Sequence, residues 1–157
     1  MFLSLFLTKN QKLVRKWTKD HENIVLLTNQ VIAEYSKNNH KKAKKLLVNL
    51  NNLVVDHVTD ENIEFYKLLK DEDRLSIKNK AYTEEFIETF AEIKKDLMAF
   101  LTKYTRKDVA LDDEFFEELT TLADVLVERI QYEESKLYAI LNISREEEKW
   151  EKIKRSI

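Results

Sequence analysis

The stretch VVDHVTDENIEFYKLL, residues 54–69, decides the fold of this chain and contains its most unusual feature. Apolar residues recur through it at steps of three and four, the spacing of an amphipathic helix with one buried face. Continued one turn toward the N-terminus, that face consists of Leu50, Val54, His57, Glu61, Phe65 and Leu68. A histidine and a carboxylate therefore interrupt a stripe that should be apolar, and they need a physical reason.

The composition around this stretch favours a helical protein. The chain has 157 residues and contains neither glycine nor proline, the residues that supply tight turns, left-handed corners and strand bulges. These absences argue against a β-rich or doubly wound fold. The length suits one domain around a single core. We predict an all-α protein in which residues 1–157 form a single domain.

Charge and cysteine content narrow the classes of partner and chemistry. The 27 basic and 29 acidic residues leave a net charge of −2, so nothing suggests nucleic acid or an anionic membrane as a partner. The absence of cysteine excludes a disulfide framework and a thiol nucleophile, and it fits a cytoplasmic location. A phosphate-binding loop would need glycine, and no serine has an obvious base beside it. We therefore expect no enzymatic activity.

Four long amphipathic patterns follow one another along the chain. The first begins at a capping box formed by Thr8 and Gln11 and ends near residues 36–40, and the second runs from there to the charged cluster at residues 71–74. Thr83 is expected to cap the third helix, and Asp112 or Asp113 the fourth. Without glycine, the corners between the helices are expected to use Asn38, Asn39, Asp71 and Asp108.

These patterns predict an antiparallel up-down-up-down four-helix bundle. A further capping box at Ser144 and Glu147 predicts a short C-terminal helix over residues 144–155. The fourth inward stripe is expected to end with Glu133, Leu137 and Ile140. The predicted core of the bundle comprises Trp17, Phe65, Phe86, Phe90, Phe100, Phe115 and Leu126.

Two segments lie outside the four amphipathic patterns. Residues 1–7, MFLSLFL, are too few to span a membrane and lack the basic start and cleavage site of a signal peptide. We interpret them as a buried helical lead-in, with a membrane or partner contact as the alternative. Together with the last helix and its Trp150, they are the segments expected to meet another protein or a second copy in a homodimer. The other reading is that they fold back on the ends of the bundle.

The inward stripes place a polar layer near the middle of the bundle. His21 lies on the first helix, His57 and Glu61 on the second, and Arg129 and Glu133 on the fourth. A buried, unpaired carboxylate costs several kcal/mol, so some positive charge must compensate this layer.

Two compensations are physically available. In the first, a divalent cation takes imidazole nitrogens from the histidines and oxygens from the glutamates, a donor set suited to iron, manganese or zinc. In the second, Arg129 is itself the cation, and its guanidinium forms ion pairs with both Glu61 and Glu133. The histidines then act as hydrogen-bond partners. Charge counting alone does not choose between them.

At these residues the chain resembles the hemerythrin-like, His-His-Glu cation-binding bundles. The resembling segments are KDHENI (residues 19–24), DHVTDENIEFY (56–66) and ERIQYEESKLY (128–138). In that family the first helix gives a His, the second His-x-x-x-Glu, the third a His and the fourth another His-x-x-x-Glu. These ligands hold two irons that bind or sense oxygen, nitric oxide or iron itself. The resemblance implies an iron site whose ligands here are His21, His57, Glu61 and Glu133.

Two positions depart from the family pattern. Phe90 stands where the third-helix histidine is expected, and Arg129 stands where the fourth-helix histidine is expected. An arginine placed at a ligand position repels a second metal. The resemblance therefore implies a reduced, at most mononuclear site that binds or senses a metal ion or a small gas ligand.

A second resemblance implies a different function. KLVRKW (residues 12–17), VVDHVT (54–59) and VERIQYEES (127–135) are similar to the regulator of sigma D and alginate-regulator proteins, metal-free bundles that bind the housekeeping sigma factor. The alternative function is thus an anti-sigma type of protein binding, although retention of His21, His57 and Glu61 as a set favours a hemerythrin relative. No Glu-x-x-His pair occurs, which argues against a ferritin-type di-iron oxidase.

Overall fold

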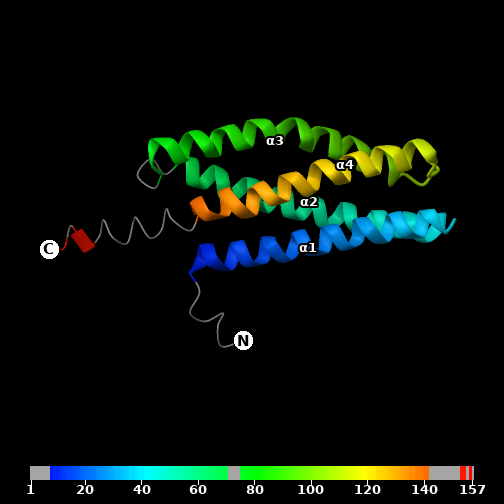
Figure 1. The fold of residues 1–157 in the computed structure, drawn as a ribbon, viewed down its shortest axis with the longest axis horizontal. Helices are drawn as coiled ribbons and strands as arrows, with labels where there is room; N and C mark the ends of the chain where they lie inside the picture. Colours follow the sequence, from blue (N-terminus) through cyan, green and yellow to red (C-terminus); the bar gives the residue numbers. More distant parts are fainter. Residues whose placement is uncertain (1–7, 71–74, 142–152, 155, 157) are drawn as a thin grey trace, which may run out of the picture.

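The helices of the protein run in alternating directions along one axis. The computed structural model describes residues 8–70, 75–141, 153–154 and 156. Within these ranges there are no strands, and the long elements are α1 (Lys9–Ser36), α2 (His40–Lys70), α3 (Ile77–Tyr104) and α4 (Asp113–Tyr132). Each helix reverses the direction of the one before it (Figure 1). The predicted all-α, antiparallel up-down-up-down four-helix bundle is confirmed.

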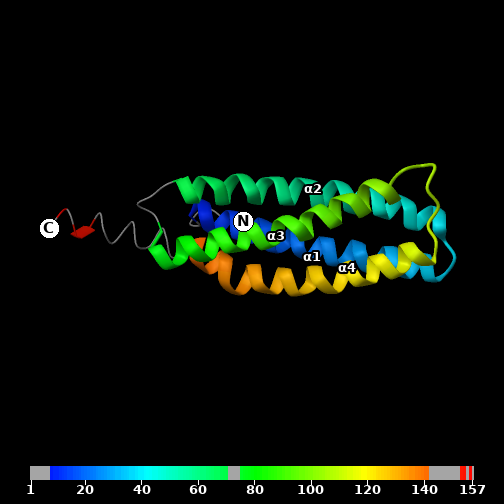
Figure 2. The same ribbon diagram turned by 90° about the horizontal axis from the view of Figure 1, so that it is seen from above.

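The packing of the four helices leaves one shared interior. α2 lies along α1, α3 packs against α2, and α4 closes the bundle against α1 and α3. Figure 2 shows the same four helices from above, extended along a common long axis. None of the described helices combines the length and the apolarity that a membrane span requires.

The helix starts follow side-chain caps, with one correction to the sequence prediction. Thr8 caps α1 in the predicted capping box with Gln11, and Asp112 caps α4. Thr83 does not cap α3, which begins earlier at a cap formed by Ser76, whose hydroxyl accepts from the backbone N–H of Asn79. The apolar stripe of α3 starts only in its second turn, so the periodicity placed the start too late. Thr83 lies inside the helix and is buried.

The corner between α1 and α2 shows how the chain turns without glycine. Asn38 has a φ of 63°, the left-handed conformation that glycine usually supplies at a helix C-terminus and that asparagine tolerates. The side-chain amide of Asn39 donates to the carboxylate of Glu34 at 2.7 Å and fixes the same corner. Asp108 lies in the α3–α4 connection, paired with Arg106. Asp71 lies outside the described residues.

The predicted core is confirmed at all but one position. Six of its members are buried: Trp17, Phe65, Phe86, Phe90, Phe100 and Phe115. Leu126 is only partly buried, packed against this core. Of the predicted C-terminal helix, Ile153 and Lys154 are helical, and the rest of residues 144–155 lies outside the described residues. The lead-in at residues 1–7 and Trp150 also lie outside them.

A π-helical turn follows α4 and changes which side chains face inward. It spans Glu133–Leu137, and the backbone N–H of Tyr138 donates to the carbonyl of Glu133, five residues earlier. Such a turn accommodates one extra residue compared with an α-helix. The buried positions after Leu137 are consequently Tyr138 and Leu141, and Ile140, expected inward from α-helical spacing, is only partly buried.

Candidate metal centre

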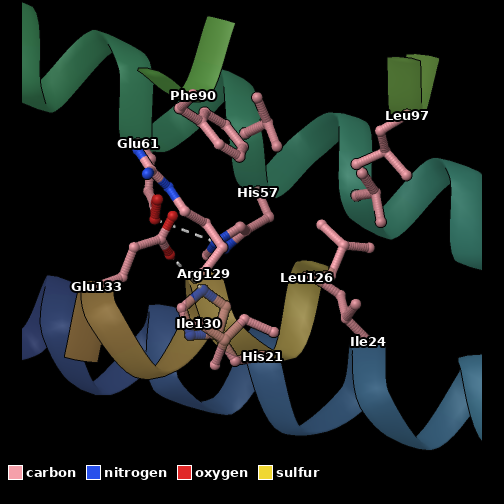
Figure 3. Close-up of a pocket in the computed structure, with 12 residues that line it drawn as sticks. His21, Ile24, His57, Glu61, Phe90, Leu97, Leu126, Arg129, Ile130 and Glu133 are labelled. Atoms are coloured by element: carbon pink, nitrogen blue, oxygen red, sulfur yellow. Dashed lines mark ion pairs between the residues drawn. The ribbon is translucent and has the colours of Figure 1, made fainter. Parts of the chain in front are cut away.

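Three helical elements bring four side chains into one buried group. His21 comes from α1, His57 and Glu61 from α2, and Glu133 from the π turn. We call this set the His-Glu cluster. One potential ligand atom from each residue lies within 4.8 Å of all the others, and all four residues are at most 5% exposed. Figure 3 shows the four side chains converging on one another. The sequence prediction of a shared layer is thus correct for these residues.

Each histidine of the cluster meets a glutamate through its Nε2 atom. His21 Nε2 lies 3.0 Å from Glu133 Oε2, between α1 and the π turn. His57 Nε2 lies 3.2 Å from Glu61 Oε2 within α2, the i,i+4 pair visible in the sequence. The inner face of the cluster therefore consists of two imidazole nitrogens and two carboxylate groups.

A second pair of carboxylates holds the outer edges of the imidazoles. His57 Nδ1 lies 3.0 Å from Asp20 Oδ2, and His21 Nδ1 lies 3.1 Å from Glu134 Oε1. A carboxylate at Nδ1 fixes the proton on that nitrogen and turns the Nε2 lone pair toward the centre. Sequence reasoning missed Asp20 and Glu134. In the sequence, each is marked only by its place next to a cluster residue. That each contacts the histidine of another helix is seen only in the structure.

Tyr138 is a further member of the site that the sequence did not reveal. Its hydroxyl donates to Glu61 Oε2 at 2.9 Å and lies 3.3 Å from His21 Nε2. The ring stacks on His21 and is 2% exposed. Burial and the neighbouring carboxylates raise the pKa of Tyr138, so the phenol keeps its proton. At α-helical spacing Tyr138 flanks the inward stripe, and only the π turn brings it inside.

Arg129 does not act as the internal counter-ion that was one of the two sequence-based alternatives. Its Nη2 donates to the Phe86 carbonyl at 2.6 Å and its Nη1 to Thr89 Oγ1 at 3.1 Å. The guanidinium also stacks on the Phe86 ring, 3.8 Å from its centroid. No ion pair joins it to a glutamate among the described residues, because α3 offers a carbonyl, a hydroxyl and an aromatic face within reach. That alternative, with Arg129 forked onto Glu61 and Glu133, is wrong.

A small cavity adjoins the cluster. Its volume is about 30 Å³, and a water molecule needs roughly 10–15 Å³ of such space. The His-Glu cluster and Arg129 line one side of it (Figure 3). Its other walls are apolar: Ile24, Val54, Val58, Phe90, Leu97, Leu126 and Ile130. One or two small molecules could occupy this space beside the cluster.

Comparison with known proteins agrees with this geometry. Residues 12–141 match the family model described as the hemerythrin HHE cation-binding domain. The chain belongs to this family. No curated protein and no solved structure matches the chain. The resemblance to the regulator of sigma D is not shown by these comparisons.

The donor groups of this hemerythrin HHE chain fit a bound cation. His57 Nε2 is buried and has no partner in hydrogen-bond geometry among the described residues, although Glu61 lies nearby. When this imidazole is neutral and its proton lies on Nδ1, toward Asp20, the Nε2 lone pair is directed to the centre. Lone pairs of nitrogen and oxygen thus converge at one buried point, the arrangement that a metal ion satisfies.

The electrostatics of the cluster indicate that it holds protons when no cation is bound. Burial raises the pKa of Glu133 to about 7, and the adjacent Glu61 carboxylate adds to this effect. Burial alone would lower the pKa of each cluster histidine, yet Glu133 raises the pKa of His21, and Glu61 raises that of His57. The cluster has more hydrogen-bond acceptor atoms than donors, and bound protons compensate for this excess. A metal ion would displace these protons.

Proposed function

We propose that the protein is a non-enzymatic binding module that holds a single iron ion in the His-Glu cluster and binds or senses a small ligand there. The observation that carries this proposal is the convergence of four buried ligand atoms within 4.8 Å of one another. Two imidazole nitrogens and two carboxylates form a mixed donor set for which iron is well suited. Family membership in the HHE cation-binding domain supports a cation as the bound species.

A single ion is proposed because the positions for a second one carry the wrong side chains. Phe90 has no ligand atom, and the guanidinium of Arg129 is a cation that is tied to α3 and lines the same cavity. A second metal would have to approach this positive charge in a buried setting, where electrostatic repulsion is weakly screened.

Binding rather than catalysis is proposed because the polar side chains that line the cavity are the proposed ligands and Arg129, a fixed cation that is hydrogen-bonded to α3 through Nη1 and Nη2. The remaining walls are apolar, and the space beside the cluster suits a molecule of the size of water or a diatomic gas. A ligand there would contact the cation and the apolar wall, with no side chain left over as a general acid or base.

The proposal is tested by measuring iron bound by the full chain, purified without an affinity tag and dialysed anaerobically against iron(II). We expect about one iron per chain. His57→Ala should abolish the binding, since it removes a ligand nitrogen. His40→Ala is the matched control, because His40 stacks on Tyr35 at the far end of α1 and lies outside the cluster. Two irons per chain, or none in the unmodified protein, would refute the proposal.

A further inference from the structure

The hydroxyl of Tyr138 reaches directly into the His-Glu cluster. Its phenol oxygen lies between Glu61 Oε2, at 2.9 Å, and His21 Nε2, at 3.3 Å. It is brought there by the π turn that starts at Glu133, itself a member of the cluster. Local π-helical turns inside α-helices are frequent at functional sites.

The spacing of the donor atoms is that of neighbouring ligands on one ion. Two adjacent ligands of a six-coordinate ion, each about 2.1 Å from it, lie about 3 Å apart. Four contacts in the cluster have this spacing, and they join five donor atoms into one chain. The order is His57 Nε2 to Glu61 Oε2 (3.2 Å), to Tyr138 Oη (2.9 Å), to His21 Nε2 (3.3 Å), to Glu133 Oε2 (3.0 Å).

The charges of these donors point to the oxidation state of the ion. Glu61 and Glu133 carry two negative charges when they coordinate, and a phenolate from Tyr138 adds a third. Buried charge is costly unless it is neutralised. A trivalent ion would leave the five-donor set neutral, since the two histidines coordinate without charge, whereas a divalent ion would leave it with a net negative charge.

We propose that Tyr138 is a fifth protein ligand, whose phenolate oxygen completes a site for iron(III) together with the His-Glu cluster. This inference rests on the proposed function, because it assumes that the cluster holds iron. Tyrosinate is an established ligand of ferric iron in proteins. Coordination replaces the O–H bond of Tyr138 by a bond to the ion, and the proton is released to solvent.

The test uses the spectroscopic signature of a phenolate bound to iron(III). The full chain is loaded with iron(II) without oxygen, oxidised with ferricyanide and freed of excess reagent, and the bound iron is counted in each sample. The unmodified protein should show a visible phenolate-to-iron charge-transfer band. Resonance Raman spectra excited in that band should show tyrosinate ring modes that shift when the tyrosines are ring-deuterated.

Two matched variants assign the signal to one residue. Tyr138→Phe should lose the band and the ring modes, and its iron(III) should pass to a competing chelator at least about 10-fold more readily. Tyr132→Phe is the control, because Tyr132 is the last residue of α4, stacked on Phe86 and outside the cluster. It should keep both the band and the retention of iron.

The outcomes separate this inference from the proposed function. Iron bound at about one per chain without tyrosinate modes in the unmodified protein overturns the role of Tyr138 and leaves the iron site standing. Modes that persist in Tyr138→Phe also overturn it. Absence of bound iron overturns both proposals. The spectrum of the unmodified protein decides the matter even if Tyr138→Phe does not fold.

Discussion

Each histidine of the cluster is held between two carboxylates, one at either ring nitrogen. Glu133 and Glu134 flank His21, and Glu61 and Asp20 flank His57. Because the outer carboxylate fixes the ring, the inner nitrogen is aimed before any ion arrives. The i,i+4 spacing of His57 and Glu61 was readable from the sequence. The outer carboxylates could not be read from the sequence, since each lies on a different helical element from the histidine that it contacts.

Replacing Arg129 with His is expected to increase iron uptake. The change removes a fixed positive charge and places a nitrogen donor at the fourth-helix position of the family pattern. The variant should bind iron(II) more tightly than the unmodified protein, by about 10-fold or more if one nitrogen ligand is gained. Equilibrium dialysis against iron(II) measures this directly.

The same variant is expected to be less stable without metal. Arg129 loses two hydrogen bonds to α3 and its stacking on Phe86, which together suggest a cost of about 2 kcal/mol. Arg129→Gln serves as the control, because it removes the charge without supplying a nitrogen ligand. Equal iron affinity in both variants would contradict a gained ligand.

At the scale of elements, the π turn determines which residues of the fourth helix reach the site. It inserts one residue into the α-helical register, so that Glu133, Leu137 and Tyr138 are all buried. Periodicity could not reveal this, because a regular spacing of 3.6 residues contains no signal for a local insertion. Around the turn, the predicted inward positions Glu133 and Leu137 are buried, whereas Ile140 is only partly buried and Tyr138 and Leu141 are buried instead.

Deleting Ser135 is expected to be tolerated. Ser135 is exposed within the π turn, and removing one residue there converts the turn to α-helix while the flanking segments keep their faces. Deleting the exposed Asp124 from regular α-helix should instead rotate the rest of α4 by about 100° and remove Glu133 from the cluster. Thermal unfolding followed by circular dichroism measures both effects. Equal loss of stability in the two deletions would contradict the interpretation of the π turn as a one-residue insertion.

At the scale of the whole molecule, the buried cluster couples global stability to pH. The pKa of Glu133 is raised to about 7, and those of His21 and His57 are raised above their usual value of 6.5. Between the unfolded-state and the folded-state pKa values of these groups, the folded state therefore binds more protons than the unfolded state. The free energy of unfolding falls as pH rises through this interval. For Glu133 this direction is opposite to that of a carboxylate stabilised in its charged form.

The metal-free protein is thus expected to be more stable at pH 6 than at pH 8, whereas the stabilisation by added iron(II) should be greater at pH 8. Metal and protons compete for the same nitrogen and oxygen atoms, which gives the two effects opposite signs. Urea unfolding with and without iron(II), at both pH values and under anaerobic conditions, measures them. An increase in metal-free stability between pH 6 and pH 8 would contradict this assignment. His40→Ala, with its histidine outside the cluster, should leave the pattern unchanged.

The bundle is expected to fold without the C-terminal residues that follow Leu141. The described core is formed by α1 to α4 and the π turn, and Leu141 closes it, with its carbonyl accepting from the side-chain amide of Asn10 at 3.0 Å. A chain ending at Leu141 should show helical circular dichroism and cooperative thermal unfolding, and it should retain iron binding. A chain ending at Tyr132 is the contrast, since it lacks Glu133, Tyr138 and Leu141. Loss of cooperative unfolding in the longer truncation would show that the terminal segment belongs to the core.

The sequence by itself determined the helical class, the four-helix arrangement and the presence of His21, His57, Glu61 and Glu133 in one layer. These features depend on local propensity and on hydrophobic periodicity, which a single sequence contains. It also showed the departure at Arg129 from the family pattern, but it left open whether this arginine neutralises the layer.

Only the tertiary structure decided where Arg129 points and which further groups join the cluster. Arg129 contacts Phe86 and Thr89 instead of the glutamates because of the distances between helices. Distances between helices also determine the contacts that Asp20, Glu134 and Tyr138 make with the cluster. A shift of one residue in register, as in the π turn, changes these distances by several ångströms and leaves the composition and most of the periodicity unaltered. Contacts between residues separated by about 40 to 110 positions therefore appear only when the chain is folded.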